Sequence, residues 1–151
     1  MKYKAPQSHI HVIARALMIS GDNLIFCHSH KTDWLFLPGG HVEDGESIKE
    51  ALARELREEI GLGDYKIGEL LGVFENNFAL DDKYQQHEIN LVFQVDVLAG
   101  FVPVCREKHI EYVIVPKKDF AKYHVLPSEL QKAVPHWLAG KGFIFGGYSA
   151  L

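Results

Sequence analysis

The stretch "GGHVEDGESIKEALARELREEIGL", from Gly39 to Leu62, is the most informative part of this chain. Its sequence gathers glutamates in one loop and one predicted helix, although the whole chain has a formal net charge of only −4. We expect a helix from Ser47 to Ile60, because Ser47 and Glu50 form a capping box and Gly61 stands where a left-handed cap would end it. So many carboxylates on one short segment call for a chemical explanation.

The predicted helix has an apolar stripe with carboxylates beside it. At about 100° per residue, the stripe consists of Ile48, Leu52, Leu56 and Ile60. Glu55, Glu58 and Glu59 lie within an arc of about 100° next to it. Carboxylates so close to a buried stripe repel one another unless a cation lies among them. Arg54 is one nearby cation, but one arginine cannot neutralise three glutamates, so the pattern predicts a hard divalent ion such as Mg²⁺ or Mn²⁺.

The loop before this helix fits a phosphate ligand. Gly39 and Gly40 let the backbone approach a ligand closely, and the helix N-terminus behind them favours negative charge. A phosphate-bearing substrate bridged by a metal ion is therefore expected here.

Composition indicates one α/β domain over residues 1–151. The 151 residues are 47% hydrophobic, which suits a single domain with its own core, and no apolar run is long enough to span a membrane. We expect a cytoplasmic protein whose two cysteines, Cys27 and Cys105, are free and buried. The mild negative charge gives no sign of a general nucleic-acid binding surface, so any phosphate must be bound locally.

The rest of the chain adds strands around this helix. A hairpin is predicted over residues 9–28, with a turn at 20–23, and a short apolar run over 34–38 in which Trp34 and Phe36 fill the sheet interior. Further strands are expected at 67–78, 87–97 and 110–115, followed by a closing helix over 127–138 that Pro135 kinks or splits. The aromatic ending after residue 139 is either an ordered anchor or a loose tail.

The segment from Gly40 to Leu62 resembles the Nudix box. All nine specified positions of that motif are filled, by Gly40, Glu46, Arg54, Glu55, Leu56, Glu58, Glu59, Gly61 and Leu62. The order of predicted elements is also similar to the Nudix α/β/α sandwich, in which a mixed β-sheet lies between helices. The resemblance implies a metal-dependent pyrophosphohydrolase that cleaves a nucleoside diphosphate linked to another moiety.

The resemblance also implies roles for the box residues. Glu58 and Glu59 would be metal ligands, and Glu55 would be a ligand or the base that activates water. Arg54 would orient Glu55, and a carbonyl of Gly39 or Gly40 would join the metal shell. Many Nudix enzymes add a carboxylate from a later loop, and the candidate here is Glu107, with Glu111 and Glu88 behind it. Each of these three reads equally well as a surface carboxylate.

Other side chains have weaker functional readings. Three aromatics are possible nucleobase platforms but suit core or lid positions better, namely Phe78, Tyr84 and Phe143. The histidine pairs in "HIH" and "HSH" share a strand face, yet no second set of zinc ligands accompanies them.

Two functional classes follow from these residues. The first is a pyrophosphohydrolase acting on an NTP or damaged NTP, ADP-ribose or a nucleotide sugar, or a dinucleoside polyphosphate. The alternative is a non-hydrolytic Nudix-fold module that binds or senses a nucleotide. A purely structural acidic helix would leave the placement of Gly40, Glu46 and Gly61 unexplained. Either class would act on a nucleotide-derived small molecule, as a monomer or a homodimer.

Overall fold

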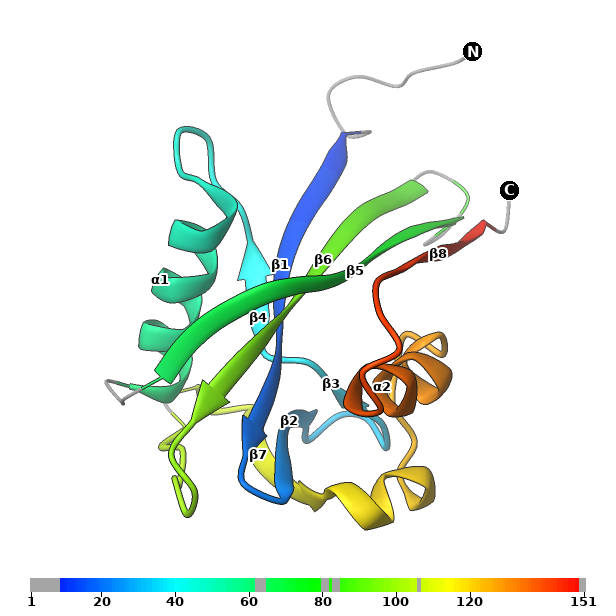
Figure 1. The fold of residues 1–151 in the computed structure, drawn as a ribbon. Coiled ribbons are helices and arrows are strands. Elements are labelled where there is room, and N and C mark those ends of the chain that lie inside the picture. The colour runs from blue at the N-terminus through cyan, green and yellow to red at the C-terminus, as the bar shows by residue number, and fades with distance from the viewer. Residues whose placement is uncertain (1–8, 62–64, 80–81, 83–84, 106, 150–151) are drawn as a thin grey trace.

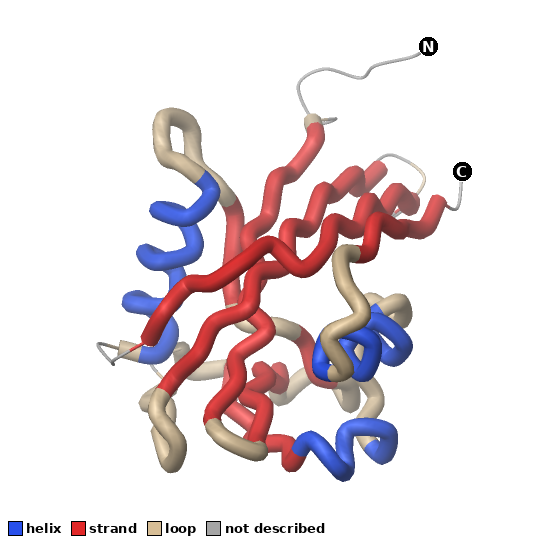
Figure 2. Tube along the Cα trace, in the orientation of Figure 1, coloured by secondary structure: helices blue, strands red, loops and turns tan. Residues whose placement is uncertain are grey.

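A mixed β-sheet forms the centre of the molecule, with helices on both of its faces (Figures 1 and 2). The structure is a computed structural model that describes residues 9–61, 65–79, 82, 85–105 and 107–149. The first hairpin joins β1 (Ile10–Ser20) to β2 (Asn23–Ser29). Two short strands, β3 (Leu35–Phe36) and β4 (Gly39–His41), then lead into helix α1 (Ile48–Ile60).

The second half of the chain supplies the long strands and the second helix. β5 (Tyr65–Ala79) and β6 (Gln85–Val97) pair antiparallel, and β7 (Ile110–Pro116) continues into a 3₁₀ helix, η1 (Lys117–Lys122). Helix α2 (Leu130–Leu138) and strand β8 (Ile144–Ser149) complete the fold. Neighbouring strands follow the order β3-β2-β1-β6-β5-β8, while β4 pairs with β1 and β7 pairs with β2. The β1–β6 and β5–β8 pairs are parallel.

Each face of the sheet has its own hydrophobic core. On one face, Leu52, Leu56 and Ile60 of α1 pack against alternate residues of β1, namely Ala14, Ala16 and Met18. On the other, α2 and η1 pack against the remaining positions, which include Leu17. This alternation follows from the two-residue period of a strand. The α/β/α sandwich with a mixed sheet is therefore confirmed.

Several predicted elements differ in detail from the structure. The closing helix begins at Leu130 rather than at Pro127, and it remains one helix with Pro135 inside it. Gly61 has a positive φ of 78°, as predicted, but its ψ of −173° is not the left-handed helical conformation. Within the predicted ending, Ile144–Ser149 form β8, yet Phe143 and Phe145 are 56% and 71% exposed, so these aromatics do not anchor it in the core.

The two cysteines differ in their exposure to solvent. Both are free, but only Cys27 is buried, whereas Cys105 is exposed on the loop before β7. The prediction of buried thiols is therefore wrong for Cys105. No helix in the part of the chain that the structure describes has the length and hydrophobicity needed to cross a membrane.

Candidate active site

The N-terminus of α1 is fixed by its capping box. The Ser47 hydroxyl accepts a hydrogen bond from the Glu50 backbone N–H at 3.1 Å, and the Glu50 carboxylate accepts one from the Ser47 N–H at 2.8 Å. Each side chain satisfies a backbone donor that a free helix end would leave unpaired. The cap fixes the end of the loop that joins β4 to α1. Gly39 and Gly40 lie in strand β4 and not in that loop, and Gly40 faces Glu55 rather than the first turn of α1, so this part of the prediction is wrong.

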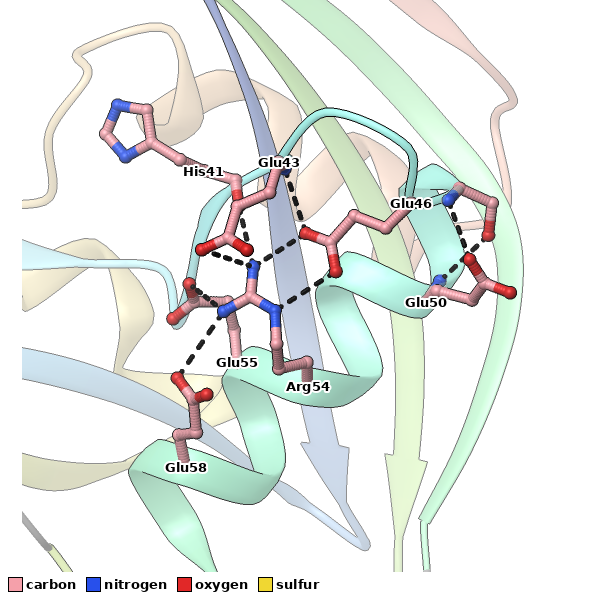
Figure 3. A network of polar contacts seen from close by, with 8 residues as sticks. His41, Glu43, Glu46, Glu50, Arg54, Glu55 and Glu58 are labelled. Atoms are coloured by element: carbon pink, nitrogen blue, oxygen red, sulfur yellow. Dashed lines mark hydrogen bonds and ion pairs between the residues drawn. The ribbon is translucent and has the colours of Figure 1, made fainter.

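Arg54 organises the carboxylates around that loop (Figure 3). Its guanidinium binds both oxygens of Glu46, from Nε at 3.1 Å and from Nη2 at 2.7 Å. Nη1 donates to Glu55 at 3.0 Å and to Glu58 at 3.4 Å, and Nη2 also donates to the His41 carbonyl at 3.0 Å. The Arg54 hydrogen bonds lower the pKa of Glu46 to about 2. Glu46 and Glu55 in turn raise the pKa of Arg54.

Gly40 lies directly beneath the Glu55 carboxylate. A β-carbon built on Gly40 would be 2.4 Å from the Glu55 carboxyl carbon. Strand β4 holds Gly40 opposite Ala14 of β1, so this contact joins the sheet to α1. The absence of a side chain at position 40 therefore lets the Glu55 carboxylate lie against β4, where Arg54 also binds it.

Glu59 is the most unusual carboxylate of the cluster. Its side chain is largely buried, and its Oε2 atom has no hydrogen-bond partner among the described residues. Burial, together with the charges of Glu55 and Glu107, raises the pKa of Glu59 to about 8. A hydrogen bond from the Gly39 backbone N–H opposes this shift. A buried oxygen without a partner is costly unless a ligand completes it.

Glu107 approaches this cluster from the loop between β6 and β7. Its side chain is exposed, and its charge contributes to the raised pKa of Glu59. The two alternatives considered with it lie elsewhere. Glu111 binds His28 Nδ1 at 2.8 Å, and Glu88 lines a cavity on the other face of the sheet. Of the three, Glu107 is thus the one whose charge acts on Glu59.

The cluster is suited to a hard divalent cation, although it is not arranged around one. Within the described ranges, no group of three His, Cys, Asp or Glu side chains converges to hold a metal ion. Arg54 explains this arrangement, because it pairs with Glu55 and Glu58 and draws both carboxylates toward itself. The partnerless Glu59 oxygen and the all-oxygen donor set nevertheless fit Mg²⁺ or Mn²⁺.

A cavity of about 470 Å³ opens on the α2 face of the sheet. Its floor comes from β1, β6 and β5, and its walls come from the segment around β3 and from the residues that lead into α2. The lining residues include four aromatics, namely Trp34, Phe36, Phe74 and Phe78. This volume lies within the range of about 300–1,000 Å³ that is usual for small-molecule sites.

Polar groups are placed at several points of this apolar cavity. Asn76 of β5 is only 6% exposed, and its Oδ1 atom has no partner among the described residues. Glu129, just before α2, also has a buried oxygen without one. Arg15 of β1 lines the cavity and donates to Asn90 Oδ1 of β6 at 3.5 Å. Such groups are the usual means by which an apolar pocket orients a ligand.

A match to a protein-family model identifies the family of this architecture. The model of the NUDIX domain matches residues 9–137. The chain belongs to the Nudix family. The predicted Nudix box therefore lies in a Nudix domain, on the loop and helix described above.

Individual proteins agree with this assignment. Over 64 residues, or 42% of this chain, the sequence is 45% identical to an ADP-ribose pyrophosphatase of Methanocaldococcus jannaschii, and the match spans 36% of that protein's length. A MutT protein structure from Methanosarcina mazei is similar over 87% of this chain and 95% of its own, with a TM-score of 0.68 and 23% identity. A MutT protein structure from Bacillus halodurans is similar over 92% and 90%, with a TM-score of 0.67 and 19% identity. These structural similarities confirm the Nudix fold.

The box residues predicted from the sequence come together in space. Glu46, Arg54, Glu55 and Glu58 form one hydrogen-bonded network, and Glu59 lies beside it against Gly39. Leu56 is buried in the core under α1. Leu62, the last position of the Nudix box, lies outside the described residues.

The predictions for the aromatic residues and the histidines have mixed outcomes. Trp34 and Phe36 line the cavity rather than fill the sheet interior, and Phe78 lines it as well. Phe143 is exposed away from the cavity, and Tyr84 lies outside the described residues. His28 and His30 both approach Glu111, and His11 contacts His41 at 3.1 Å, without forming a metal site in the described part of the chain.

Sequence reasoning missed the polar residues of the cavity. Arg15, Asn76 and Asn90 come from three separate strands, and they meet only because β1, β6 and β5 are neighbours in the sheet. One signal was available in the sequence. Asn76 and Asn90 interrupt strands that are otherwise rich in apolar and aromatic residues, at positions where a buried polar group needs a reason.

Proposed function

We propose that this Nudix protein hydrolyses a phosphoric anhydride bond in a nucleoside diphosphate linked to another moiety, with Mg²⁺ or Mn²⁺ as its cofactor. The observation that carries the proposal is the buried Glu59 oxygen without a partner, next to the Glu55–Arg54 pair. The cluster concentrates negative charge where a cation and a phosphate would meet. A bound divalent cation supplies stabilisation of the charge that develops on the phosphate oxygens.

In this proposal the box carboxylates have different roles. Glu58 and Glu59 hold the cation, and a carbonyl of Gly39 or Gly40 adds a neutral oxygen. Glu55 holds the cation or receives the proton of the attacking water as that water forms a bond to phosphorus and the anhydride oxygen leaves. The Arg54 hydrogen bond at 3.0 Å fixes the orientation of the Glu55 carboxylate. Glu107 is the proposed late-loop carboxylate of the same site.

The nucleoside has a natural place in the cavity on the α2 face. The cavity is largely apolar and aromatic, and its unpartnered Asn76 and Glu129 oxygens suit the N–H donors of a base or the hydroxyls of a ribose. The candidate substrates are an NTP or damaged NTP, ADP-ribose or a nucleotide sugar, and a dinucleoside polyphosphate. The partial identity to an ADP-ribose pyrophosphatase supports testing ADP-ribose first.

Three further properties belong to the proposal. We expect residues 1–151 to act as one domain, located in the cytoplasm, and to work as a monomer or a homodimer. The formal net charge of −4 supports a small-molecule substrate over a general nucleic-acid partner.

A product-resolved assay tests the function. The purified protein is incubated with Mg²⁺ and then with Mn²⁺ against NTPs, oxidised NTPs, ADP-ribose, nucleotide sugars, NADH and dinucleoside polyphosphates. Cleavage of one class, lost on addition of EDTA, is the expected result. A folded protein that binds these nucleotides but cleaves none of them would contradict hydrolysis and favour the sensing module.

A further inference from the structure

Arg15 is a half-buried cation whose hydrogen-bond partners among the described residues are all uncharged. Its Nη1 donates to the Leu37 carbonyl at 3.1 Å and to the Gly39 carbonyl at 3.5 Å, and its Nε donates to Asn90 Oδ1. Within the described residues, Nη2 makes no hydrogen bond and no carboxylate forms an ion pair with the guanidinium. Burial lowers the pKa of Arg15, which reflects the cost of keeping this charge away from water. Arg54 differs, because it binds carboxylates directly.

The position of Arg15 lies between the two parts of the proposed site. On one side it contacts Gly39, whose N–H donates to Glu59. The positive charge of Arg15 also interacts with the charges of Glu55 and Glu59. On the other side it lines the cavity on the α2 face. Arg15 therefore lines the cavity and at the same time contacts the strand that lies against the carboxylate cluster.

Arg15 also carries the positive charge of the cavity. It is the one Lys or Arg among the described residues that line it, whereas Glu88 and Glu129 contribute negative charge. A guanidinium has five N–H donors in a planar fork that matches the oxygens of a phosphate. Glu88, Glu59 and Glu55 act on the Arg15 charge, but none of them is hydrogen-bonded to the guanidinium, so an anion arriving here would be its first hydrogen-bonded charged partner among the described residues.

We propose that Arg15 binds the phosphate group attached directly to the nucleoside, so that it joins the nucleoside cavity to the carboxylate cluster. This inference rests on the proposed nucleotide substrate but not on hydrolysis. Arg15 is then a substrate-binding residue in addition to a brace for the loop at Leu37 and Gly39. A brace alone would support the loop equally for ligands with and without a phosphate.

The test compares each nucleoside monophosphate with its nucleoside in the absence of metal. AMP, CMP, GMP and UMP and the four nucleosides are titrated into the full chain in EDTA, and affinities are measured by calorimetry. We expect at least one monophosphate to bind ten times or more tighter than its nucleoside, as charge-assisted hydrogen bonds to phosphate allow. In Arg15→Gln this ratio should fall to about two or less, while Arg57→Gln, which changes an exposed arginine on α1, should keep it.

The possible results distinguish phosphate binding by Arg15 from a purely bracing role. A wild-type ratio near one, or an unchanged ratio in a folded Arg15→Gln protein, would overturn the role of Arg15. Where Arg15→Gln does not fold, Arg15→Lys decides, because an ammonium cannot bind the Leu37 carbonyl and a phosphate with the same fork. Its ratio should fall about threefold or more, and an unchanged ratio would again overturn the proposal. Because no metal or turnover is involved, a failure of hydrolysis leaves this result interpretable.

Discussion

The Glu55 carboxylate occupies the space that a β-carbon on Gly40 would need. A methyl group there would lie 2.4–2.6 Å from the carboxyl carbon and both oxygens. Gly40 is not among the glycines with positive φ, so its backbone does not require glycine. Glycine at this position is therefore needed by the side chain of another residue, the one proposed to accept a proton.

This relationship predicts a selective effect of Gly40→Ala. The three nearest atoms all belong to the end of a flexible side chain, so Glu55 should swing away and the fold should lose about 1 kcal/mol or less. Turnover should fall tenfold or more, because the displaced carboxylate no longer faces the reacting water. Kinetics and thermal unfolding on the same preparation check this. Full activity in a folded Gly40→Ala protein would contradict the assignment of Glu55.

Gly39→Ala is the matched contrast. Gly39 has a φ of 137°, and a β-carbon there would lie 2.0 Å from the Ala14 carbonyl oxygen in the neighbouring strand. Backbone cannot move as a side-chain end can. We therefore expect Gly39→Ala to lower the unfolding temperature markedly. Gly40→Ala should then damage the site, whereas Gly39→Ala should damage the fold.

Glu58→Gln should abolish most activity and preserve the structure. Glu58 is exposed, and its one hydrogen bond to the described residues is a long one, 3.4 Å to Arg54, so its loss removes a proposed metal charge rather than a core contact. Steady-state kinetics with saturating Mg²⁺ and circular dichroism provide the comparison. Glu69→Gln, on an exposed position of β5, is the control and should retain wild-type turnover. Near-normal turnover in Glu58→Gln would remove Glu58 from the metal site.

Glu107→Gln should reduce turnover by a factor of ten or more. The reason is that its charge acts on Glu59, the proposed ligand of the cation. Glu111→Gln serves as control, since that carboxylate pairs with His28 instead. If the two variants behave alike and both remain active, Glu107 is a surface residue.

Glu59 gives the metal-free protein a distinctive pH dependence. Its pKa of about 8 lies above the ordinary 4.5, so the folded state binds the proton more tightly than the unfolded chain. The stability linked to this proton is fully present below pH 4.5 and is lost as the pH rises through 8. Between these limits the loss should amount to roughly 2–4 kcal/mol. Chemical unfolding in EDTA at several pH values should show it, and Glu59→Gln should remove that part of the slope.

The same proton should be released when the metal binds. At pH 7 most Glu59 side chains are protonated in the metal-free protein, and a cation needs the carboxylate form. Calorimetry of Mn²⁺ binding in buffers of different ionisation enthalpy should give close to one proton per ion for the wild type and far less for Glu59→Gln. Binding without proton release in the wild type would show that Glu59 is not a ligand.

The sequence was most informative where local rules decide the structure. The capping box of Ser47 and Glu50 and the 3.6-residue period of α1 fix which side chains share a face, so the meeting of Arg54 with Glu58 could be predicted, whereas its contact with Glu55 was implied by the family resemblance. The family resemblance added Glu46, whose salt bridge with Arg54 spans eight residues from the loop before the helix. Roles that depend on a bound cation remain predictions.

The cavity could not be predicted because it depends on strand register. Asn76 and Asn90 face Arg15 only because β1 runs parallel to β6 with Arg15 opposite Val92, a pairing between segments far apart in the chain. Trp34 and Phe36 were assigned to the interior because an apolar side chain has the same sequence signature in a packed core and in a cavity wall. Gly61 showed the required positive φ but not the predicted ψ.

The alternation of β1 has a consequence for how new specificities arise. Ala14, Ala16 and Met18 serve the face that carries α1, while Arg15 and Leu17 serve the face that carries the cavity. Most substitutions that reshape the cavity therefore leave the packing under the box helix untouched. Under the proposed function, changes of base or leaving-group specificity on one side of the sheet would therefore leave the proposed hydrolytic residues on the other side unchanged.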